Sequence, residues 1–240
     1  MKVYLFKVSI FFLLAFPSVV FSQEEKSIWI DAKAGLNSVW LVNQNAYNNK
    51  EMDYSTTFGL TAGMGVNYFL NEGWGLNFSP GYIQLGQNYS DNTSTGDVTR
   101  KLKLAYIQLP FLLMRKVPMT NDPTWIAFGP DIMILTGAKQ DFKINSGAYP
   151  LNNPDGMISG DIKRRFNPVD IALDFSVNKM FELVSNDNMM FLLSFNSSVG
   201  LLDISSKDWQ LPNLHGEYKG SHNFYFGLKA GLMFRVSDGR

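Results

Sequence analysis

Eight stretches of this chain alternate, residue by residue, between a bulky apolar register and a small or polar register. In the stretch 58–68, Phe, Leu, Ala, Met, Val and Tyr occupy every second position, and Gly, Thr and Asn lie between them. Successive side chains of a β-strand point to opposite faces, so this period of two predicts half-buried strands. The other seven stretches are 28–37, 74–82, 102–115, 126–134, 169–178, 189–198 and 223–236.

The connections between these stretches alternate in length. The shorter ones are 70–73, 116–123 and 179–188, and the longer ones, rich in Asn, Asp, Ser and Gly, are 41–53, 86–101, 137–168 and 201–221. Tight turns at one end, long loops at the other and an even number of strands are typical of a small outer-membrane barrel. The sequence therefore predicts an all-β fold: an eight-stranded antiparallel up-and-down transmembrane β-barrel with both chain ends in the periplasm.

Glycine falls repeatedly in the polar register, for example at Gly63, Gly65, Gly227 and Gly231. On a water-exposed face Gly would only weaken the strands, whereas the narrow interior of an eight-stranded barrel needs small side chains. We therefore expect small and polar side chains inside and the bulky register against lipid. A soluble secreted barrel is the alternative, and it requires the bulky register to point inward.

Aromatic residues near the strand ends fit the girdles that such barrels place at both membrane interfaces. Trp29, Trp74 and Trp125 lie at the short-turn ends of their strands, and Trp40 and Tyr54 lie at the long-loop ends. We expect these five residues to form the interface girdles.

The N-terminus has the features of an export signal. Lys2 and Lys7 are followed by a continuous apolar run from Ile10 to Phe16, and Val20–Ser22 is close to the small-residue pattern of a cleavage site. A membrane anchor is the alternative, but the run is shorter than the ~20 residues that span a bilayer. We predict a signal peptide at 1–22 and an outer-membrane β-barrel domain at 23–240, which implies residence in the outer membrane after export.

Composition excludes several classes of protein. The chain has no Cys, so disulfides, thiolate metal sites and a lipid-modified Cys at the cleavage site are excluded. Cleavage would remove Lys2 and Lys7, which leaves 19 basic residues against 21 acidic ones. This balance gives no basic face of the kind that binds nucleic acid. Outer-membrane lipid is the expected surrounding of the mature chain.

The stretch 106–113, Tyr-Ile-Gln-Leu-Pro-Phe-Leu-Leu, resembles a strand of the PorT-type outer-membrane β-barrel proteins of Bacteroidetes. That family usually has Glu where this chain has Gln108. The layout of the whole mature chain is similar to the family, although only this strand and the last one share its motifs. The resemblance implies a small barrel of the cell envelope that is associated with protein secretion.

The last stretch is similar to the assembly signal of outer-membrane barrels. Lys229, Gly231, Phe234 and Val236 provide its polar residue, its glycine and its two aromatic or apolar positions. The resemblance implies the barrel assembly machinery as a partner. A half-buried strand without a signalling role matches part of the same pattern, and residues 237–240 extend beyond the usual end of the motif.

The inward register carries seven charged residues: Asp31, Lys33, Asp131, Asp170, Asp174, Lys229 and Arg235. The first and last strands must pair to close the barrel, so Lys33 and Lys229 are expected near Asp31 and Asp174. A buried charge is tolerated when it is paired and hydrogen-bonded. We therefore expect a charge network that plugs the lumen, with a gated polar pore as the alternative.

No residue set forms a catalytic signature, and we expect no cofactor and no metal site. His215 and His222 lie around the last long loop with several Ser residues, but their spacing does not single out a lipid-modifying enzyme or a metal site. The loops are better candidates. Lys163–Arg165 could contact anionic lipopolysaccharide headgroups or be a solvated loop base. The apolar residues of the last long loop could form a binding surface or fold back over the barrel mouth; they are Trp209, Leu211, Pro212 and Leu214.

The sequence therefore predicts a non-enzymatic outer-membrane β-barrel protein. Its expected role is that of a structural or surface-interaction component of the envelope, associated with other envelope or secretion proteins. The alternatives are a barrel that binds or transports a small ligand, which needs an open lumen, and a lipid-modifying enzyme, which needs a histidine held against Ser and a carboxylate.

Overall fold

A computed structural model of the chain describes residues 26–42, 52–93, 96–118, 123–144, 159–183, 188–210 and 216–239. The strands are β1 (Lys26–Val42), β2 (Asp53–Ser55), β3 (Phe58–Phe69), β4 (Trp74–Phe78), β5 (Gly81–Thr93), β6 (Gly96–Lys116), β7 (Thr124–Ile144), β8 (Gly160–Asp161), β9 (Val169–Glu182), β10 (Met189–Gly200) and β11 (His222–Gly239). Two 3₁₀ turns, η2 (Lys163–Arg165) and η3 (Lys207–Trp209), precede β9 and β11. The predicted signal peptide lies outside the described residues.

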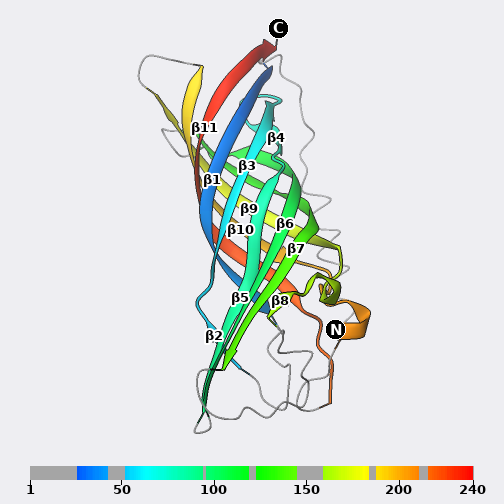
Figure 1. Ribbon diagram of the computed structural model, residues 1–240. Helices are drawn as coiled ribbons and strands as arrows, with labels where there is room; N and C mark the ends of the chain where they lie inside the picture. The colour runs from blue at the N-terminus through cyan, green and yellow to red at the C-terminus, as the bar shows by residue number, and fades with distance from the viewer. Residues whose placement is uncertain are drawn as a thin grey trace.

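The strands close into a ring of eight antiparallel positions (Figure 1). β1 pairs with both β3 and β11, which joins the two ends of the sheet. β4 and β5 share one position, because β3 and β6 each pair with both of them. The short strands β2 and β8 extend the ladders of β5 and β7. The predicted eight-stranded up-and-down barrel is confirmed. No helix in the described ranges is long and apolar enough to cross a bilayer.

The bulky register covers the outer surface of the barrel. Phe58, Leu60 and Met64 are 60%, 61% and 68% exposed, and Leu228 on β11 is 58% exposed. The intervening Thr61, Asn67 and Lys229 are buried. An apolar surface of this extent on all sides would be a severe liability in water, whereas lipid matches it. The side chains point to the faces that the alternation predicts, and the alternative of a soluble barrel is excluded.

Glycine in the inward register lets the first and last strands approach each other. A Cβ added at Gly35 would overlap the Leu228 carbonyl oxygen of β11, and one at Gly227 would overlap the Leu36 carbonyl oxygen and Asn37 Oδ1 of β1. These positions therefore tolerate no side chain at the present strand spacing, which is the physical reason for glycine where the barrel closes.

The interior is built in three layers, which differs from the expected filling by small and polar side chains. Along β1, the inward residues run from Trp29 through Asp31 and Lys33 to Val39 and Leu41. Trp29 belongs to a periplasmic apolar layer with Leu112, Met114, Trp125, Ala127, Met180, Leu192 and Met233. Val39 and Leu41 belong to an outer apolar layer with residues such as Ile83, Leu104, Tyr106, Met133 and Tyr225. Asp31 and Lys33 lie between the two, in what we call the polar belt.

The girdle prediction is wrong for two of its five residues. Trp29 and Trp125 are buried in the periplasmic apolar layer because their positions fall in the inward register. Trp40 packs against Phe224, with ring centroids 5.6 Å apart. Tyr54 is exposed. Trp74 is half-buried and lies under the Arg115 guanidinium, 4.6 Å from its carbon.

The prediction of a long loop at 86–101 is also wrong, because most of this segment is strand. β5 and β6 pair from Gly81↔Gln108 to Thr93↔Gly96, and β7 follows them to Ile144. In Figure 1 these strands extend beyond the ring at the end opposite the C-terminus. The extension has its own inner face, where Arg100 donates to Gln140 Oε1 at 2.8 Å and lies 5.2 Å from the Tyr89 ring. We assign this end to the cell exterior.

Candidate functional sites in the lumen and at the outer mouth

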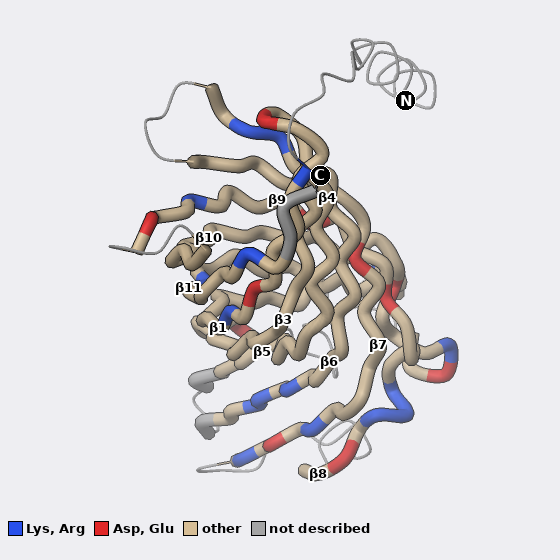
Figure 2. Tube along the Cα trace, turned by 90° about the horizontal axis from the view of Figure 1, so that it is seen from above, with Lys and Arg blue, Asp and Glu red and all other residues tan. Residues whose placement is uncertain are grey.

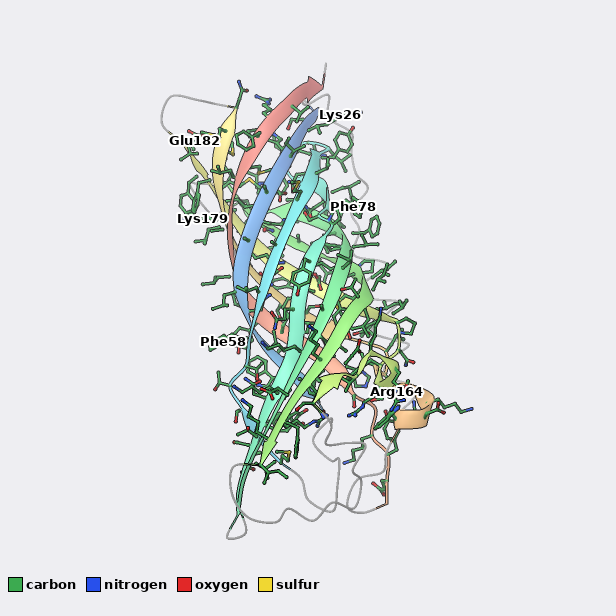
Figure 3. The ribbon with its side chains drawn as sticks, in the orientation of Figure 1. Lys26, Phe58, Phe78, Arg164, Lys179 and Glu182 are labelled. Carbon is green, nitrogen blue, oxygen red and sulfur yellow. The ribbon has the colours of Figure 1, made fainter. Side chains whose placement is uncertain are left out.

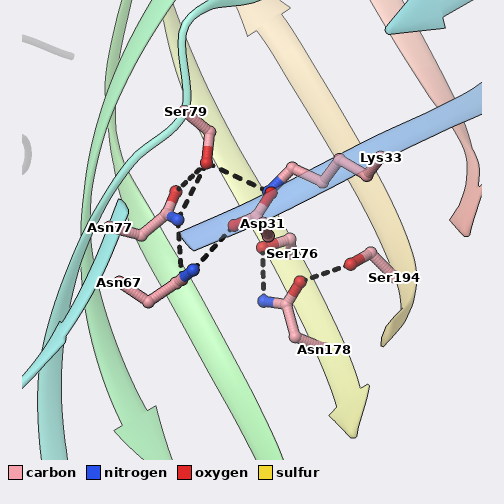
Figure 4. A network of polar contacts seen from close by, with 8 residues as sticks. All are labelled: Asp31, Lys33, Asn67, Asn77, Ser79, Ser176, Asn178 and Ser194. Atoms are coloured by element: carbon pink, nitrogen blue, oxygen red, sulfur yellow. Dashed lines mark hydrogen bonds and ion pairs between the residues drawn. The ribbon is translucent and has the colours of Figure 1, made fainter. Parts of the chain in front are cut away.

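The polar belt is held on one side by a hydrogen-bonded group from β1, β3 and the β4–β5 break (Figure 4). Lys33 Nζ lies 3.3 Å from Asp31 Oδ1 and donates to Ser79 Oγ at 3.0 Å. Asn67 donates to Asp31 Oδ2 at 2.6 Å, and Asn77 donates to Asn67 Oδ1 at 2.8 Å. Each of these groups thus has a polar partner inside the barrel, as the burial of polar groups requires.

A second group in the belt comes from β9 and β10, and Figure 4 shows it beside the first. Asn178 donates to Ser176 Oγ at 2.9 Å and accepts from Ser194 at 2.5 Å. Asn196 donates to Asn37 Oδ1 at 3.2 Å, which links β10 to β1 across β11. The contact between Asn196 and Asn37 joins strands that are not adjacent in the sheet, so it cross-links the wall from inside.

The remaining predicted charges divide between the belt and its borders. Lys229 is buried within electrostatic range of Lys33, Asp31, Asp131 and Asp174. Asp131 Oδ1 accepts the Leu109 main-chain N–H at 2.8 Å, and Asp174 Oδ2 accepts from the Tyr225 hydroxyl at 3.4 Å.

Asp170 and Arg235 lie toward opposite ends of the lumen. Asp170 accepts from Asn223 Nδ2 at 2.9 Å, beside the outer apolar layer. Arg235 lies at the periplasmic end, opposite Trp29 in the β1–β11 ladder, with its guanidinium carbon 5.8 Å from that ring. The structure thus brings Asp31, Lys33, Asp131, Asp174 and Lys229 together and places Asp170 and Arg235 apart from them.

A polar cavity of about 40 Å³ lies inside the belt. Its walls include Lys33, Asn77, Gln108, Asp174 and Lys229. A space of this size and polarity holds a few water molecules. The apolar layers above and below it are made of large side chains such as Tyr106 and Met114, which are almost completely buried. The described part of the lumen is therefore filled at three levels, and this cavity is too small for an organic solute.

The wall beside this cavity contains three prolines at one level, which we call the proline seam. Pro80 lies between β4 and β5, Pro110 on β6 and Pro130 on β7. Proline has no N–H to donate to a sheet. The β6–β7 pairing is interrupted between Pro110↔Asp131 and Leu113↔Phe128. Asp131 replaces one of the missing hydrogen bonds between the strands, because its side chain accepts the Leu109 N–H from the lumen side.

The outer mouth is covered by an ordered cap, which consists of residues 160–168, 201–210 and 216–221. Asp203 organises it: its Oδ1 accepts the Ser205 and Ser221 N–H groups at 3.0 Å each, and its Oδ2 accepts from the Tyr218 hydroxyl at 2.6 Å. Burial and the Asp203 carboxylate raise the pKa of Tyr218 to about 12. Asn167 donates to the Asp203 carbonyl oxygen at 2.8 Å, which ties the cap segments together.

Sequence reasoning did not identify Asp203 or Asn167, because both fall in segments with no periodic pattern. Ile162, Phe166 and Ile204 of the cap pack on the outer apolar layer. The cap thereby closes the barrel from outside.

The three basic residues Lys163–Arg165 differ in exposure. Lys163 and Arg164 are exposed, whereas Arg165 is 3% exposed and lies 4.3 Å from the Trp209 ring. Trp209 is therefore part of the folded cap. Its neighbours Leu211, Pro212 and Leu214 lie outside the described residues.

The histidines contribute no recognisable catalytic arrangement. His215 lies outside the described residues, and His222 Nδ1 is buried without a hydrogen-bond partner in the described part of the chain. Within the same ranges, no group of three or more His, Asp or Glu residues could hold a metal ion.

Residues 21–206 match the family described as outer membrane protein beta-barrel domain. The chain belongs to this family. It is an outer-membrane β-barrel protein, and the outer membrane is its location. No curated protein sequence matches the chain. The PorT-type family and the Bacteroidetes origin remain predictions. So does the assembly signal, of which Lys229 points into the lumen while Phe234 and Val236 face outward.

Solved structures of other small outer-membrane proteins are similar to the chain. Neisserial surface protein A is 11% identical, with 88% of this chain and 99% of that chain covered and a TM-score of 0.43. OprG from Pseudomonas aeruginosa is 9% identical, with 89% and 98% covered and a TM-score of 0.38. Ail of Yersinia pestis, solved with a heparin analogue, is 13% identical, with 88% and 99% covered and a TM-score of 0.36. Identities this low transfer no function to the chain.

Proposed function

We propose that this protein is a non-enzymatic component of the cell envelope that uses its outer cap to contact other envelope or secretion proteins. The barrel anchors and orients the cap, and the filled lumen serves as a rigid support. A secretion partner is what the PorT-type resemblance implies. Export by the N-terminal signal peptide and insertion by the barrel assembly machinery, through Lys229, Gly231, Phe234 and Val236, belong to the same proposal.

The observation that carries this proposal is the contrast between the lumen and the mouth. Two apolar layers and a charge-paired belt fill the lumen, which argues against transport. The mouth carries a cap fixed by the Asp203 hydrogen bonds and by strand extensions beyond the ring. An ordered surface at the exposed end of a filled barrel has the features of an interaction site, since rigid presentation lowers the entropy cost of binding.

The competing functions have less support. A ligand-binding or transport barrel needs an unfilled lumen, and the belt cavity has a volume of only about 40 Å³. Such a barrel would conduct ions in a planar bilayer, whereas we expect the purified protein to show no steady conductance. A lipid-modifying enzyme needs a histidine in a hydrogen-bonded relay with Ser and a carboxylate, and His222 Nδ1 has no partner among the described residues.

Photo-crosslinking in intact cells tests the proposed surface. A crosslinking residue placed at Lys207 or at Glu217, both exposed in the cap, is expected to give a discrete adduct with an envelope protein. The matched control is Glu182, which is exposed at the periplasmic end in Figure 3 and should not give that adduct. The same adduct from all three positions, or no adduct from the cap, would contradict the proposal.

A further inference from the structure

A row of cations crosses the outer surface of β6 and β7 just above the ring. Lys103 on β6 lies directly opposite Lys139 on β7, and Lys139 lies opposite Asp161 on β8. Residues directly opposite in antiparallel strands point to the same face, and all three are exposed. Lys163 and Arg164 follow at once on η2, which contacts β7. Figure 2 shows the blue Lys and Arg positions on these strands. We call Lys103, Lys139, Lys163 and Arg164 the cationic rim.

The cationic rim lies at the outer limit of the lipid-facing band. The last bulky outward residues on these strands are Ile107, Ile134 and Val169, which lie side by side in the ladders. Lys103 is four residues beyond Ile107, a rise of about 13 Å at the usual strand spacing. Ala105 and Thr136 occupy the interval. Lysine stems of this length can lie along the strand surface and hold their ammonium groups at the headgroup level.

Cations outnumber carboxylates on this surface among the described residues. Like charges directly opposite in a sheet are destabilising, and Asp161, opposite Lys139, supplies one counter-charge to the pair Lys103↔Lys139. Nearby Asp141 lies 3.7 Å from Lys143, and Asp161 Oδ1 accepts the Lys163 main-chain N–H at 2.8 Å. Including Lys101 and Lys143, six cations face two carboxylates, Asp141 and Asp161, in the described part of this surface.

We propose that the cationic rim binds the phosphate groups of a phosphorylated glycolipid in the outer leaflet, with the acyl chains against Ile107, Ile134 and Val169. Phosphate matches exposed Lys and Arg, and the apolar surface directly beneath fits a ligand that is also a lipid. A soluble anion would use only the charges. The proposal depends on the membrane placement of the barrel and not on a protein partner. It therefore stands even if the protein contacts proposed above for the cap are disproved.

The test compares lipid retention by full-length variants. Each protein is reconstituted in phosphatidylcholine nanodiscs with diphosphorylated lipid A, and the lipid that remains bound is counted by native mass spectrometry. Removal of each lysine is expected to weaken retention by about fivefold, so K103Q/K139Q should lose most of the bound lipid. K103R/K139R should retain it. The control K26Q/K179Q removes the same charge at the periplasmic end, where Figure 3 places both residues, and should retain lipid A.

Two further arms identify the ligand. Dephosphorylated lipid A should not be retained by the wild type, and inorganic phosphate at millimolar concentration should not displace the intact lipid. Equal retention of the dephosphorylated lipid would overturn the proposal, and so would full displacement by inorganic phosphate or equal losses in K103Q/K139Q and K26Q/K179Q. Thermal unfolding in detergent confirms that every variant compared is folded.

Discussion

The two sides of the barrel wall are built differently. On the closing side, β1 pairs with β11 from Lys26 to Val42 with one register shift, between Ile28 and Trp29. On the opposite side, the proline seam breaks the third strand into β4 and β5 and interrupts the β6–β7 ladder. The closing side is therefore held by main-chain hydrogen bonds, whereas the proline side depends on side chains for part of its connection.

The interior supplies those side chains. Asp131 accepts the Leu109 N–H from inside the lumen, next to Pro110. Ser79 and Asn77, at the break between β4 and β5, bond each other and reach Lys33 and Asn67. A buried polar group that replaces ladder bonds contributes to the wall as well as to the filling of the lumen. This contrast indicates that polar-belt substitutions should weaken the proline side more than the closing side.

The largest effect is expected from blocking the close approach of β1 and β11. Gly35→Val places a side chain where the Leu228 carbonyl oxygen lies and should destabilise the barrel by about 3 kcal/mol. The control is Ala34→Val, one residue along the same strand but facing lipid, which should change stability little. Urea unfolding in lipid vesicles measures both. Similar losses of stability in the two variants would show that the close spacing of β1 and β11 does not require glycine at position 35.

The second-largest loss of stability is expected at the proline seam. Asp131→Ala leaves the buried Leu109 N–H without its acceptor and should cost about 2 kcal/mol. Asp131→Asn keeps an acceptor oxygen and should recover much of that loss, although it removes the acidic group near Lys229. The same unfolding assay compares the two. If the Asn variant is as unstable as the Ala variant, the acidic group near Lys229 and not the hydrogen bond to Leu109 supports this wall.

Part of the fold could be predicted from the sequence and part could not. The period of two assigned Phe175, Leu193 and Leu228 to the lipid face because alternation depends only on strand geometry. Strand ends were missed, although Val98, Leu102 and Leu104 alternate with polar residues and indicate that β6 begins early. The polar asparagine-rich segment around them hid this signal.

The layered interior and the cap were harder to predict. Trp29 and Trp125 were assigned to girdles as aromatic residues near strand ends, whereas their register directs them inward. The contacts of Asp203 join residues far apart in the chain, so neither periodicity nor motif could reveal them. Which charges meet in the belt likewise depends on barrel closure and on the angle of the strands, and the sequence specifies neither directly.

Hydrogen exchange sharpens the comparison between the two sides. Amides at 109, 111–113, 128, 129 and 131 should exchange about fivefold faster than those at 30–36, since each missing ladder bond removes about 1 kcal/mol of local stability. The water-accommodating belt cavity beside Leu112 gives exchange a local route. Nuclear magnetic resonance in lipid nanodiscs resolves these amides. Uniform protection around the ring would remove the distinction.

The smallest effect is expected outside the membrane, where the cap joins β10 to β11. Tyr218→Phe removes the bond to Asp203 and should weaken the cap by about 1 kcal/mol. Because the folded pKa of Tyr218 is raised from 10.0 to about 12, its contribution is complete below pH 10 and is lost as the pH rises through 12. Carbon-13 resonance of labelled tyrosine gives the titration midpoint, and a midpoint near 10 would contradict this account.

The central claim is that hydrocarbon surrounds the bulky register, and a thiol reagent dissolved in the bilayer tests it most directly. Cys is introduced into this cysteine-free chain at Leu228 in one variant and at Ser194 in another. In vesicles that contain a lipid-soluble maleimide, we predict rapid labelling at Leu228, which is 58% exposed, and little at Ser194, which is 2% exposed in the lumen. Rapid labelling at Ser194 with none at Leu228 would contradict the membrane barrel.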